Sequence, residues 1–424
     1  MTEVGFPPKA CGNDGGLGSR QQPAGMTIFL YASKAIYSFI QDPKIEMIKI
    51  IFNRLILLLC LSLYMQISNA VEATDAAKTM LSELGIRESD VPIKADQNWQ
   101  KPQRIVLVRP GGQIDISPAI LSSLRSAADG AELIIVSDPD TEADKIKNAD
   151  VILGSCTAVN IDMPNLKWVQ YFSAGVERCT DNPVFIDKGV MLTNMKGVYG
   201  PGIAEHVIAM MLTLSRGLHQ FQREQIKGQW NRGLASEYPL QEVRGKTMLI
   251  VGLGGIGSEI AWRASALGMR VIATRNSKHD KPEFVDYVGL ANELLTLVGQ
   301  ADVIVNAAPL TSSTLGLFDN HFFSQLKPSA YFINIGRGKS VVTDDLVEAL
   351  KTGKLAGAAL DVVEPEPLPA DHVLWQMPNV IITPHISGHS DLVMNRYWIF
   401  IRENLRRYVK GERMLNVVNI QKGY

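Results

Sequence analysis

Between Gly252 and His385 the chain carries a glycine run, an arginine in a tight turn, a glutamate and a histidine, in that order. The glycine run, GLGGIG, follows an apolar strand-like segment at 247–251 and precedes a helical pattern at 258–267. In such a run the first glycine permits the turn, the second admits a pyrophosphate, and the third lets helix pack on strand. The helix N-terminus then offers unpaired N–H groups to phosphates. This context predicts a dinucleotide site rather than an ordinary glycine turn. Its contacts would be Gly252, Gly254, Gly255, Ile256 and Gly257.

Three further reactive side chains each follow a predicted strand. Arg337 comes after the apolar run 331–335, and its planar guanidinium suits bidentate capture of a carboxylate. Glu366 stands between two prolines that stiffen the segment, and His385, after 380–382, has the side chain best suited to acid–base work near neutral pH. Alone, each could be structural. Because ligands of open α/β sheets bind outside the carboxyl ends of the strands, three such residues at successive strand ends predict a catalytic group.

The residues after the second strand of this region bear on which coenzyme is bound. An NAD enzyme is expected to carry Asp or Glu about twenty residues past the glycine run, on the ribose hydroxyls. The segment 274–278 reads TRNSK and contains no acid. Arg275 stands where the acid would be, with Ser277 close behind, which favours the 2′-phosphate of NADP. The alternative is a solvated basic loop that leaves NAD usable.

From about Arg104 to Val418 the sequence resembles the D-isomer-specific 2-hydroxyacid dehydrogenase family. The resemblance rests on the glycine run and on the segments Pro309-Leu310-Thr311, INIGRG, LDVVEPEP and TPHISG. It implies that Arg337 holds the carboxylate and carbonyl of the substrate and that His385 passes the proton. It also implies that Glu366, rather than Glu364, supports the histidine.

The same resemblance extends to further binding residues. It implies that Asp361 binds the nicotinamide amide and that backbone N–H groups of the loop at Ala174, Gly175 and Val176 grip the substrate carboxylate. Where this chain has Glu177, the family usually has Asp. Further cofactor contacts implied by the resemblance are Pro309, Ile335 and Gly388.

The expected activity is hydride transfer between a nicotinamide cofactor, NADP in preference to NAD, and a small 2-oxo or 2-hydroxy acid. Two other readings remain open. One is a dinucleotide-sensing binding protein on the same fold, whose mark would be an eroded catalytic trio. The other is a formate- or phosphite-type dehydrogenase. The resemblance also implies a homodimer.

Short apolar strands alternate with helical segments twice along the chain, which predicts two doubly wound α/β domains. We expect a flavodoxin-like substrate domain at 71–200 and 385–424. An NAD(P)-binding Rossmann domain at 201–384 would be inserted in it, with the ligand cleft between them. A helix at 201–229 would join the two, and a helical tail at 391–409 would return to the first domain. On the joining helix, His206 is expected to be a packed or capping residue.

Composition limits the other possibilities. A chain of 424 residues fits two or three domains, and its net charge of −1 provides no basic field for nucleic acid. The four cysteines, Cys11, Cys60, Cys156 and Cys179, lack the spacing of a metal site, so no metal is expected.

The first seventy residues differ from the rest. Lys49 and Arg54 precede an apolar run at 55–67 that closes in Ser68-Asn69-Ala70, the pattern of a secretory signal peptide. We therefore expect a signal at 47–70, an upstream extension at 1–46 and an exported or periplasmic protein. The alternatives are a membrane anchor or an apolar segment on a cytoplasmic enzyme. Export would place the enzyme where free nicotinamide cofactor is scarce. Whether Cys156 and Cys179 pair stays open.

Overall fold

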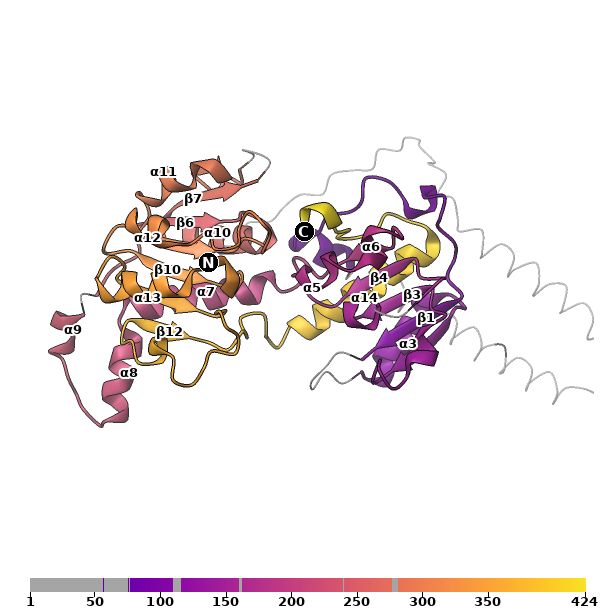
Figure 1. The fold of residues 1–424 in the computed structure, drawn as a ribbon, viewed down its shortest axis with the longest axis horizontal. Coiled ribbons are helices and arrows are strands. Elements are labelled where there is room, and N and C mark those ends of the chain that lie inside the picture. The colour runs from indigo at the N-terminus through magenta and orange to yellow at the C-terminus, as the bar shows by residue number, and fades with distance from the viewer. Residues whose placement is uncertain are drawn as a thin grey trace, which may run out of the picture. The chain divides into compact units, whose positions relative to one another are not determined.

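The computed structural model describes residues 56, 75, 77–109, 116–159, 162–238, 240–276 and 281–424. Glu72–Tyr424 forms one compact unit, which holds two parallel sheets with their helices (Figure 1). The predicted upstream extension and, apart from Ile56, the predicted signal segment lie outside the described residues. No helix among the described residues has the length and apolar character needed to cross a membrane.

The first sheet has five parallel strands in the order β2-β1-β3-β4-β5, the order of flavodoxin-like folds. Its strands are β1 (Arg104–Val108), β2 (Glu132–Val136), β3 (Val151–Gly154), β4 (Trp168–Tyr171) and β5 (Met191–Thr193). Strands β1, β3 and β4 are almost wholly buried, which is why β1 and β3 are mostly apolar in sequence. Strand β4 also contains the buried polar residue Gln170. Its helical segments are α3 (Pro118–Ala128), α4 (Ala143–Ile146), η3 (Cys156–Val159), α5 (Glu177–Thr180), α6 (Pro183–Ile186) and, from the far end of the chain, α14 (Val393–Lys410).

The second sheet has seven parallel strands in the order β12-β11-β10-β9-β6-β7-β8. Counted from β6, its first six strands follow the Rossmann order, and β12 extends the edge. The strands are β6 (Thr247–Val251), β7 (Arg270–Arg275), β8 (Tyr287–Leu290), β9 (Val303–Asn306), β10 (Tyr331–Asn334), β11 (Gly357–Leu360) and β12 (Val380–Ile382). The predicted fold class, a Rossmann sheet and a flavodoxin-like sheet, is confirmed.

Helices of the second region run from α7 to α13. They are α7 (Gly200–Ser215), α8 (Leu218–Ile226), α9 (Leu234–Glu237), α10 (Gly255–Ala266), α11 (Leu294–Val298), α12 (Asn320–Ser324) and α13 (Thr343–Lys351). Short 3₁₀ turns are η2 (Ile93–Ala95), η4 (Ala291–Glu293), η5 (Gly338–Ser340), η6 (Val373–Trp375) and η7 (Ile420–Lys422). Helix α7 packs on α10 and on strands β10 and β11, so the joining helix belongs to the second sheet.

Two predicted helices have different bounds in the structure. The expected helix 201–229 is wrong as a single element, because Gly217 adopts a left-handed φ of +63° that ends α7 and starts α8. Helix α10 begins at Gly255, inside the glycine run and three residues earlier than predicted. The run therefore supplies the first N–H groups of the helix itself.

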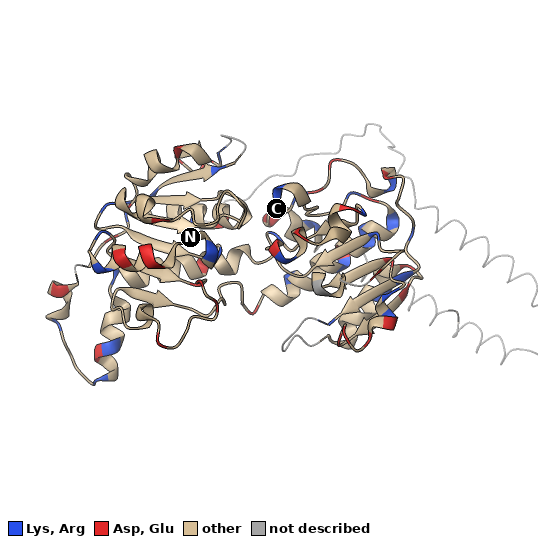
Figure 2. Cartoon of the chain, viewed as in Figure 1, with Lys and Arg blue, Asp and Glu red and all other residues tan. Residues whose placement is uncertain are grey.

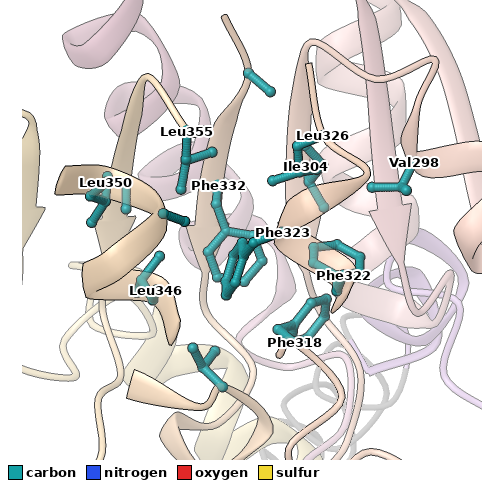
Figure 3. Close-up of a cluster of buried hydrophobic side chains, with 14 of the residues drawn as sticks. Val298, Ile304, Phe318, Phe322, Phe323, Leu326, Phe332, Leu346, Leu350 and Leu355 are labelled. Atoms are coloured by element: carbon teal, nitrogen blue, oxygen red, sulfur yellow. The ribbon is translucent and has the colours of Figure 1, made fainter. Parts of the chain in front are cut away.

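The core of the second sheet is dominated by phenylalanines. Phe318, Phe322, Phe323 and Phe332 are at most 1% exposed and pack ring against ring between the sheet and α12 and α13 (Figure 3). Most of these contacts are edge-to-face, the arrangement that the ring quadrupoles favour. They fill the core beneath β9 and β10. Both strands end at the candidate site described below.

The first sheet is completed by the end of the chain. The α14 side chains Tyr397, Phe400 and Ile401 share a buried cluster with Ile105 of β1 and Leu153 of β3. The predicted return of the C-terminal helix to the first domain is therefore seen. The domain boundaries themselves, at 71, 200 and 385, stay predictions. Basic and acidic residues are interspersed over the helices and loops around both sheets (Figure 2).

Candidate active site

The glycine run forms a cradle that a side chain would fill. Gly252 has φ +98°, and a Cβ there would lie 2.8 Å from the Ala307 carbonyl oxygen. A Cβ at Gly257 would overlap the carbonyl of Gly252, so only glycine lets α10 pack this tightly on β6. The N–H groups at the start of α10 are thereby presented to a phosphate, and the residues present fit a dinucleotide.

A cavity of about 450 Å³ adjoins this cradle, a size ordinary for a cofactor site. Residues of both sheets line it. Of the predicted cofactor and substrate contacts, the lining includes Gly252, Gly254, Gly255, Ile256, Arg275, Pro309, Ile335, Ala174, Gly175, Val176 and Arg337. Gly257, Asp361, Glu366, His385 and Gly388 do not line it. Ser277 lies outside the described residues.

Arg275 is the last residue of β7, the position where an NAD enzyme is expected to carry Asp or Glu. Its Nε donates to the carbonyl oxygen of Leu253 at 2.7 Å, which ties the end of β7 to the glycine run. The guanidinium is therefore held at the cavity wall beside Thr274 and Asn276, which line the same part of the cavity.

Arg337 follows β10 and faces the first sheet. Its Nε lies 3.0 Å from Oε1 of Glu177, its Nη2 donates to Oε2 of the same carboxylate at 3.3 Å, and its Nη1 donates to the Gly336 carbonyl at 2.7 Å. A guanidinium has five N–H donors, so these contacts leave two uncommitted. Those two donors match the two acceptor atoms of a carboxylate or of a carboxylate and its neighbouring carbonyl.

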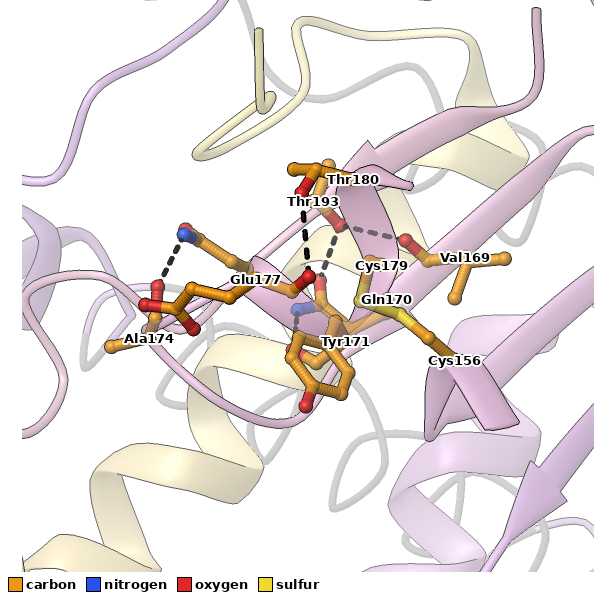
Figure 4. Close-up of a disulfide and its surroundings, with 10 residues drawn as sticks. Cys156, Val169, Gln170, Tyr171, Ala174, Glu177, Cys179, Thr180 and Thr193 are labelled. Atoms are coloured by element: carbon orange, nitrogen blue, oxygen red, sulfur yellow. Dashed lines mark hydrogen bonds between the residues drawn. A yellow bond between two sulfur atoms is a disulfide. The ribbon is translucent and has the colours of Figure 1, made fainter. Parts of the chain in front are cut away.

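The loop opposite Arg337 is fixed by its own contacts. Asn194 donates to the Ala174 carbonyl at 2.8 Å, and a Cβ at Gly175 would overlap the Arg337 guanidinium, so a larger residue there would displace the guanidinium. A disulfide joins Cys156 to Cys179 of α5 just beyond the loop (Figure 4), which answers the open question of their pairing. The loop N–H groups are thus held beside the arginine.

His385 adopts an unusual backbone conformation for its residue type, with φ +54°. Its Nδ1 lies 2.7 Å from Oε1 of Glu366, and the two side chains are 47% and 42% exposed. Such a contact fixes the imidazole orientation and leaves Nε2 to meet a substrate. The carboxylate in contact with His385 is thus that of Glu366, as predicted, and not that of Glu364. The backbone carbonyl of Glu364 accepts from the Thr343 hydroxyl at 2.9 Å.

Asp361 lies beneath the histidine turn, and its side chain is fully buried. Its carboxylate accepts from the Thr383 hydroxyl at 2.6 Å and from the N–H groups of Ile386 and Ser387 at 3.0 and 3.1 Å. Burial alone raises the pKa of the Asp361 carboxyl, but hydrogen bonds from Ser387, Thr383 and Ile386 together outweigh it, so its pKa lies below the ordinary value. The carboxylate thus fixes the turn that carries His385.

Sequence reasoning missed one member of this cluster. His206 of α7, expected to be a packed or capping residue, has its Nε2 3.0 Å from the Thr383 hydroxyl and 3.9 Å from Asp361. It links the joining helix to the histidine turn. No local pattern marks it, because its partners lie more than 150 residues away along the chain.

A second omission concerns the cavity wall. Arg87, Lys196 and Tyr424 all line the cavity, and none was predicted as a site residue. Lys196 follows β5, a strand of three residues that the apolar pattern did not reveal. Had β5 been recognised, Lys196 would have stood out as another charged residue just after a strand.

Among the described residues, no group of three metal-binding side chains is present.

Known proteins match this chain over most of its length. The model of the D-isomer specific 2-hydroxyacid dehydrogenase, NAD binding domain, family matches residues 208–387. A glyoxylate reductase of Thermofilum pendens is 34% identical over 258 residues, which are 60% of this chain and 76% of that protein.

Solved structures give the same result. An NADPH-dependent glyoxylate/hydroxypyruvate reductase of Sinorhizobium meliloti, in complex with NADP and sulfate, superposes with a TM-score of 0.64 at 28% identity, over 76% of this chain and all of that one. An NAD-dependent formate dehydrogenase of Staphylococcus aureus, in complex with NAD, has a TM-score of 0.59 at 28% identity, over 72% of this chain and 95% of that one. Similar structures therefore bind either coenzyme.

The substitution Asp361→Asn should destabilise the protein at pH 7 by about 1–3 kcal/mol, because it removes the negative charge that accepts the hydrogen bonds of the turn. The pKa of Asp361 is lowered in the folded state, so its stabilisation is complete above the unfolded value of about 3.9 and is lost as pH falls through the folded pKa. Urea unfolding from pH 7 to pH 3 should show the two proteins converging at the acid end. Asp371→Asn, at an exposed position, is the control. A constant difference at every pH would contradict the assignment.

Proposed function

Because the chain belongs to the D-isomer specific 2-hydroxyacid dehydrogenase family, we propose that Arg337, Glu366 and His385 catalyse the NAD(P)H-dependent reduction of a small 2-oxoacid to its D-2-hydroxyacid, and the reverse reaction with NAD(P)⁺. The activity class is that of an NAD(P)-dependent oxidoreductase acting on CH–OH groups. The observation that carries the proposal is that the glycine cradle, the loop 174–176 and Arg337 line one cavity. The roles of His385 and Glu366 are supported by their own contact at 2.7 Å.

In this proposal each residue has a distinct task. The two uncommitted donors of Arg337 and the loop N–H groups bind the substrate carboxylate and polarise the neighbouring carbonyl. A bound nicotinamide cofactor supplies the hydride in the reducing direction. His385 gives its proton to the carbonyl oxygen, and Glu366 stabilises the imidazolium and its orientation. Because His385 does not line the cavity in this structure, the proposal requires the imidazole to approach the bound substrate.

The substitution His385→Asn tests the proton-transfer role. Asparagine tolerates the left-handed backbone that His385 adopts, so the turn should keep its shape while the imidazole is lost. We expect kcat for glyoxylate reduction to fall by about 10²–10⁴-fold and the Kd for NADPH to stay within twofold. Steady-state kinetics and fluorescence titration measure the two quantities.

His389→Asn is the matched control, since His389 is an exposed histidine four residues away and should tolerate the change. Near-normal turnover of His385→Asn would refute the catalytic assignment.

A substrate panel of glyoxylate, hydroxypyruvate, pyruvate and phenylpyruvate, with formate in the oxidising direction, tests the substrate class. Activity with formate alone would overturn the 2-oxoacid proposal.

We propose NADP as the preferred coenzyme. Arg275 supports this proposal, because it lines the cavity at the end of β7, where an NAD enzyme is expected to have an acid. A guanidinium there favours a 2′-phosphate through charge-assisted hydrogen bonds.

The substitution Arg275→Gln should therefore raise the Kd for NADPH by about 10–100-fold and leave the Kd for NADH almost unchanged. Paired fluorescence titrations of wild type and variant with both coenzymes measure this. Tighter binding of NADH than of NADPH by the wild type would reverse the preference.

We propose that residues 47–70 direct export and that the mature chain begins near Val71. The disulfide between Cys156 and Cys179 supports this proposal, because disulfides persist in oxidising compartments. N-terminal sequencing of the protein recovered from the periplasm is the test, and a mature chain that begins before Val71 would contradict it.

A homodimer is also proposed. Trp230 is 93% exposed and Ile226, at the end of α8, is 81% exposed, and the two lie four residues apart. Apolar side chains exposed together, rather than singly, are typical of surfaces where partners bind. Light scattering on the wild type and on Trp230→Glu measures the oligomeric state. A monomeric wild type would contradict the proposal.

A further inference from the structure

The cavity carries more positive charge than the catalytic proposal uses. Its lining contains four cationic side chains, Arg87, Lys196, Arg275 and Arg337, and a single carboxylate side chain, that of Glu177. Glu177 is already paired with Arg337. Such an excess inside a concave site attracts a polyanion, and Arg87 and Lys196 have no assigned role.

The glycine run itself carries no cation. Its only side chains larger than hydrogen belong to Leu253 and Ile256, so charge from side chains has to reach a bound pyrophosphate from elsewhere. The N–H groups of α10 provide only partial charges. A cation that neutralises the pyrophosphate must therefore come from outside the glycine run.

Lys196 reaches this place from the first sheet. A Cβ built on Gly254 would lie 3.9 Å from Cε of Lys196, and one on Gly255 would lie 3.7 Å from Cα of Gly197. The turn after β5 therefore covers the first residues of α10. The lysine side chain ends beside the glycines whose backbone faces a phosphate.

The backbone of Lys196 is held from both sides. Its N–H donates to the side chain of Asn194 at 3.2 Å, and its carbonyl accepts from the side chain of Asn416 at 2.7 Å. Both asparagines are buried. The ammonium is thus carried on a rigid turn rather than on a mobile loop, as a binding group requires.

No anion neutralises this pair of cations within the described part of the chain. The recorded contact of the Lys196 ammonium is with the ring of Tyr424, 5.9 Å from its centroid. Although the residue as a whole is exposed, burial of its ammonium and then the nearby charge of Arg87 lower the pKa of Lys196. Two like charges held together at a cavity wall gain most from an anion placed between them.

We propose that Lys196, with Arg87 beside it, binds the pyrophosphate of the dinucleotide from the side opposite the glycine run. The contact joins the first sheet to a ligand held by the second. It differs from the role of Arg275, which concerns the 2′-phosphate alone. The inference rests on the proposed enzyme only through its cofactor, so binding rather than turnover is the quantity to measure.

The test is fluorescence titration of the full chain with NADPH and with NADH. Lys196→Met keeps most of the length of the side chain and removes the charge, and it should raise both dissociation constants by about tenfold, equally for the two coenzymes. Raising the salt concentration should weaken wild-type binding more steeply than binding by the variant. Lys196→Arg should stay within about threefold of wild type, because it retains the charge.

Two controls make the result specific. Lys351→Met, at an exposed lysine that ends α13, should leave both constants unchanged. Arg275→Gln should affect NADPH only, whereas Lys196→Met affects both coenzymes. Arg87→Met should weaken both, by less than Lys196→Met.

The proposal is overturned if Lys196→Met leaves both constants within twofold of wild type. It is also overturned if that variant only raises the KM for a 2-oxo dicarboxylate such as 2-oxoglutarate, since the lysine would then serve a second anionic group on the substrate. A wild type that binds both coenzymes but reduces no 2-oxoacid defeats the proposed reaction and leaves this inference standing. A wild type that binds neither defeats both.

Discussion

The buried carboxylate of Asp361 fixes the part of the molecule on which the proposed chemistry depends. It accepts hydrogen bonds from Thr383, Ile386 and Ser387, on both sides of His385. Its backbone carbonyl accepts the N–H of His385 itself at 2.8 Å. A histidine at φ +54° is held only if its surroundings over-determine it, and these bonds do so. The family resemblance assigns Asp361 to the nicotinamide amide, whereas here its oxygens serve the turn.

The ion pair between Arg337 and Glu177 is the corresponding constraint on substrate binding. It connects a turn of the second sheet to a loop of the first, and it selects which guanidinium donors remain for a ligand. Both side chains are partly buried, so the pair is less screened than a surface pair. The Glu177 carboxylate reaches the Nε and Nη2 edge of the guanidinium directly. The position of the Arg337 guanidinium therefore depends on residues next to both sheets.

Much of the fold could be predicted from the sequence because buried parallel strands are mostly apolar, as in β1, β3 and β6. The strands β5 and β8 were not predicted, because MLT and YVGL each contain only one β-branched residue, whereas the short β12, VII, consists of them. In the site, motif spacing identified Arg337, Glu366 and His385. The partners Glu177, His206 and Lys196 could not be assigned in this way, because their contacts join segments far apart in sequence and no local pattern encodes them.

The place of α14 affects how the chain is built during synthesis. Its side chain Asn404 donates to Gln170 of β4, and Leu415 donates back to Asn404, so the first sheet is buttressed by residues made more than 200 positions later. A ribosome delivers β1 to β5 long before α14, while the whole second sheet is made in between and can fold as a unit. Nascent chains would therefore hold a half-covered sheet that awaits its last helix. During that interval the first sheet exposes the apolar surface that a chaperone, or an export machinery that needs unfolded cargo, binds.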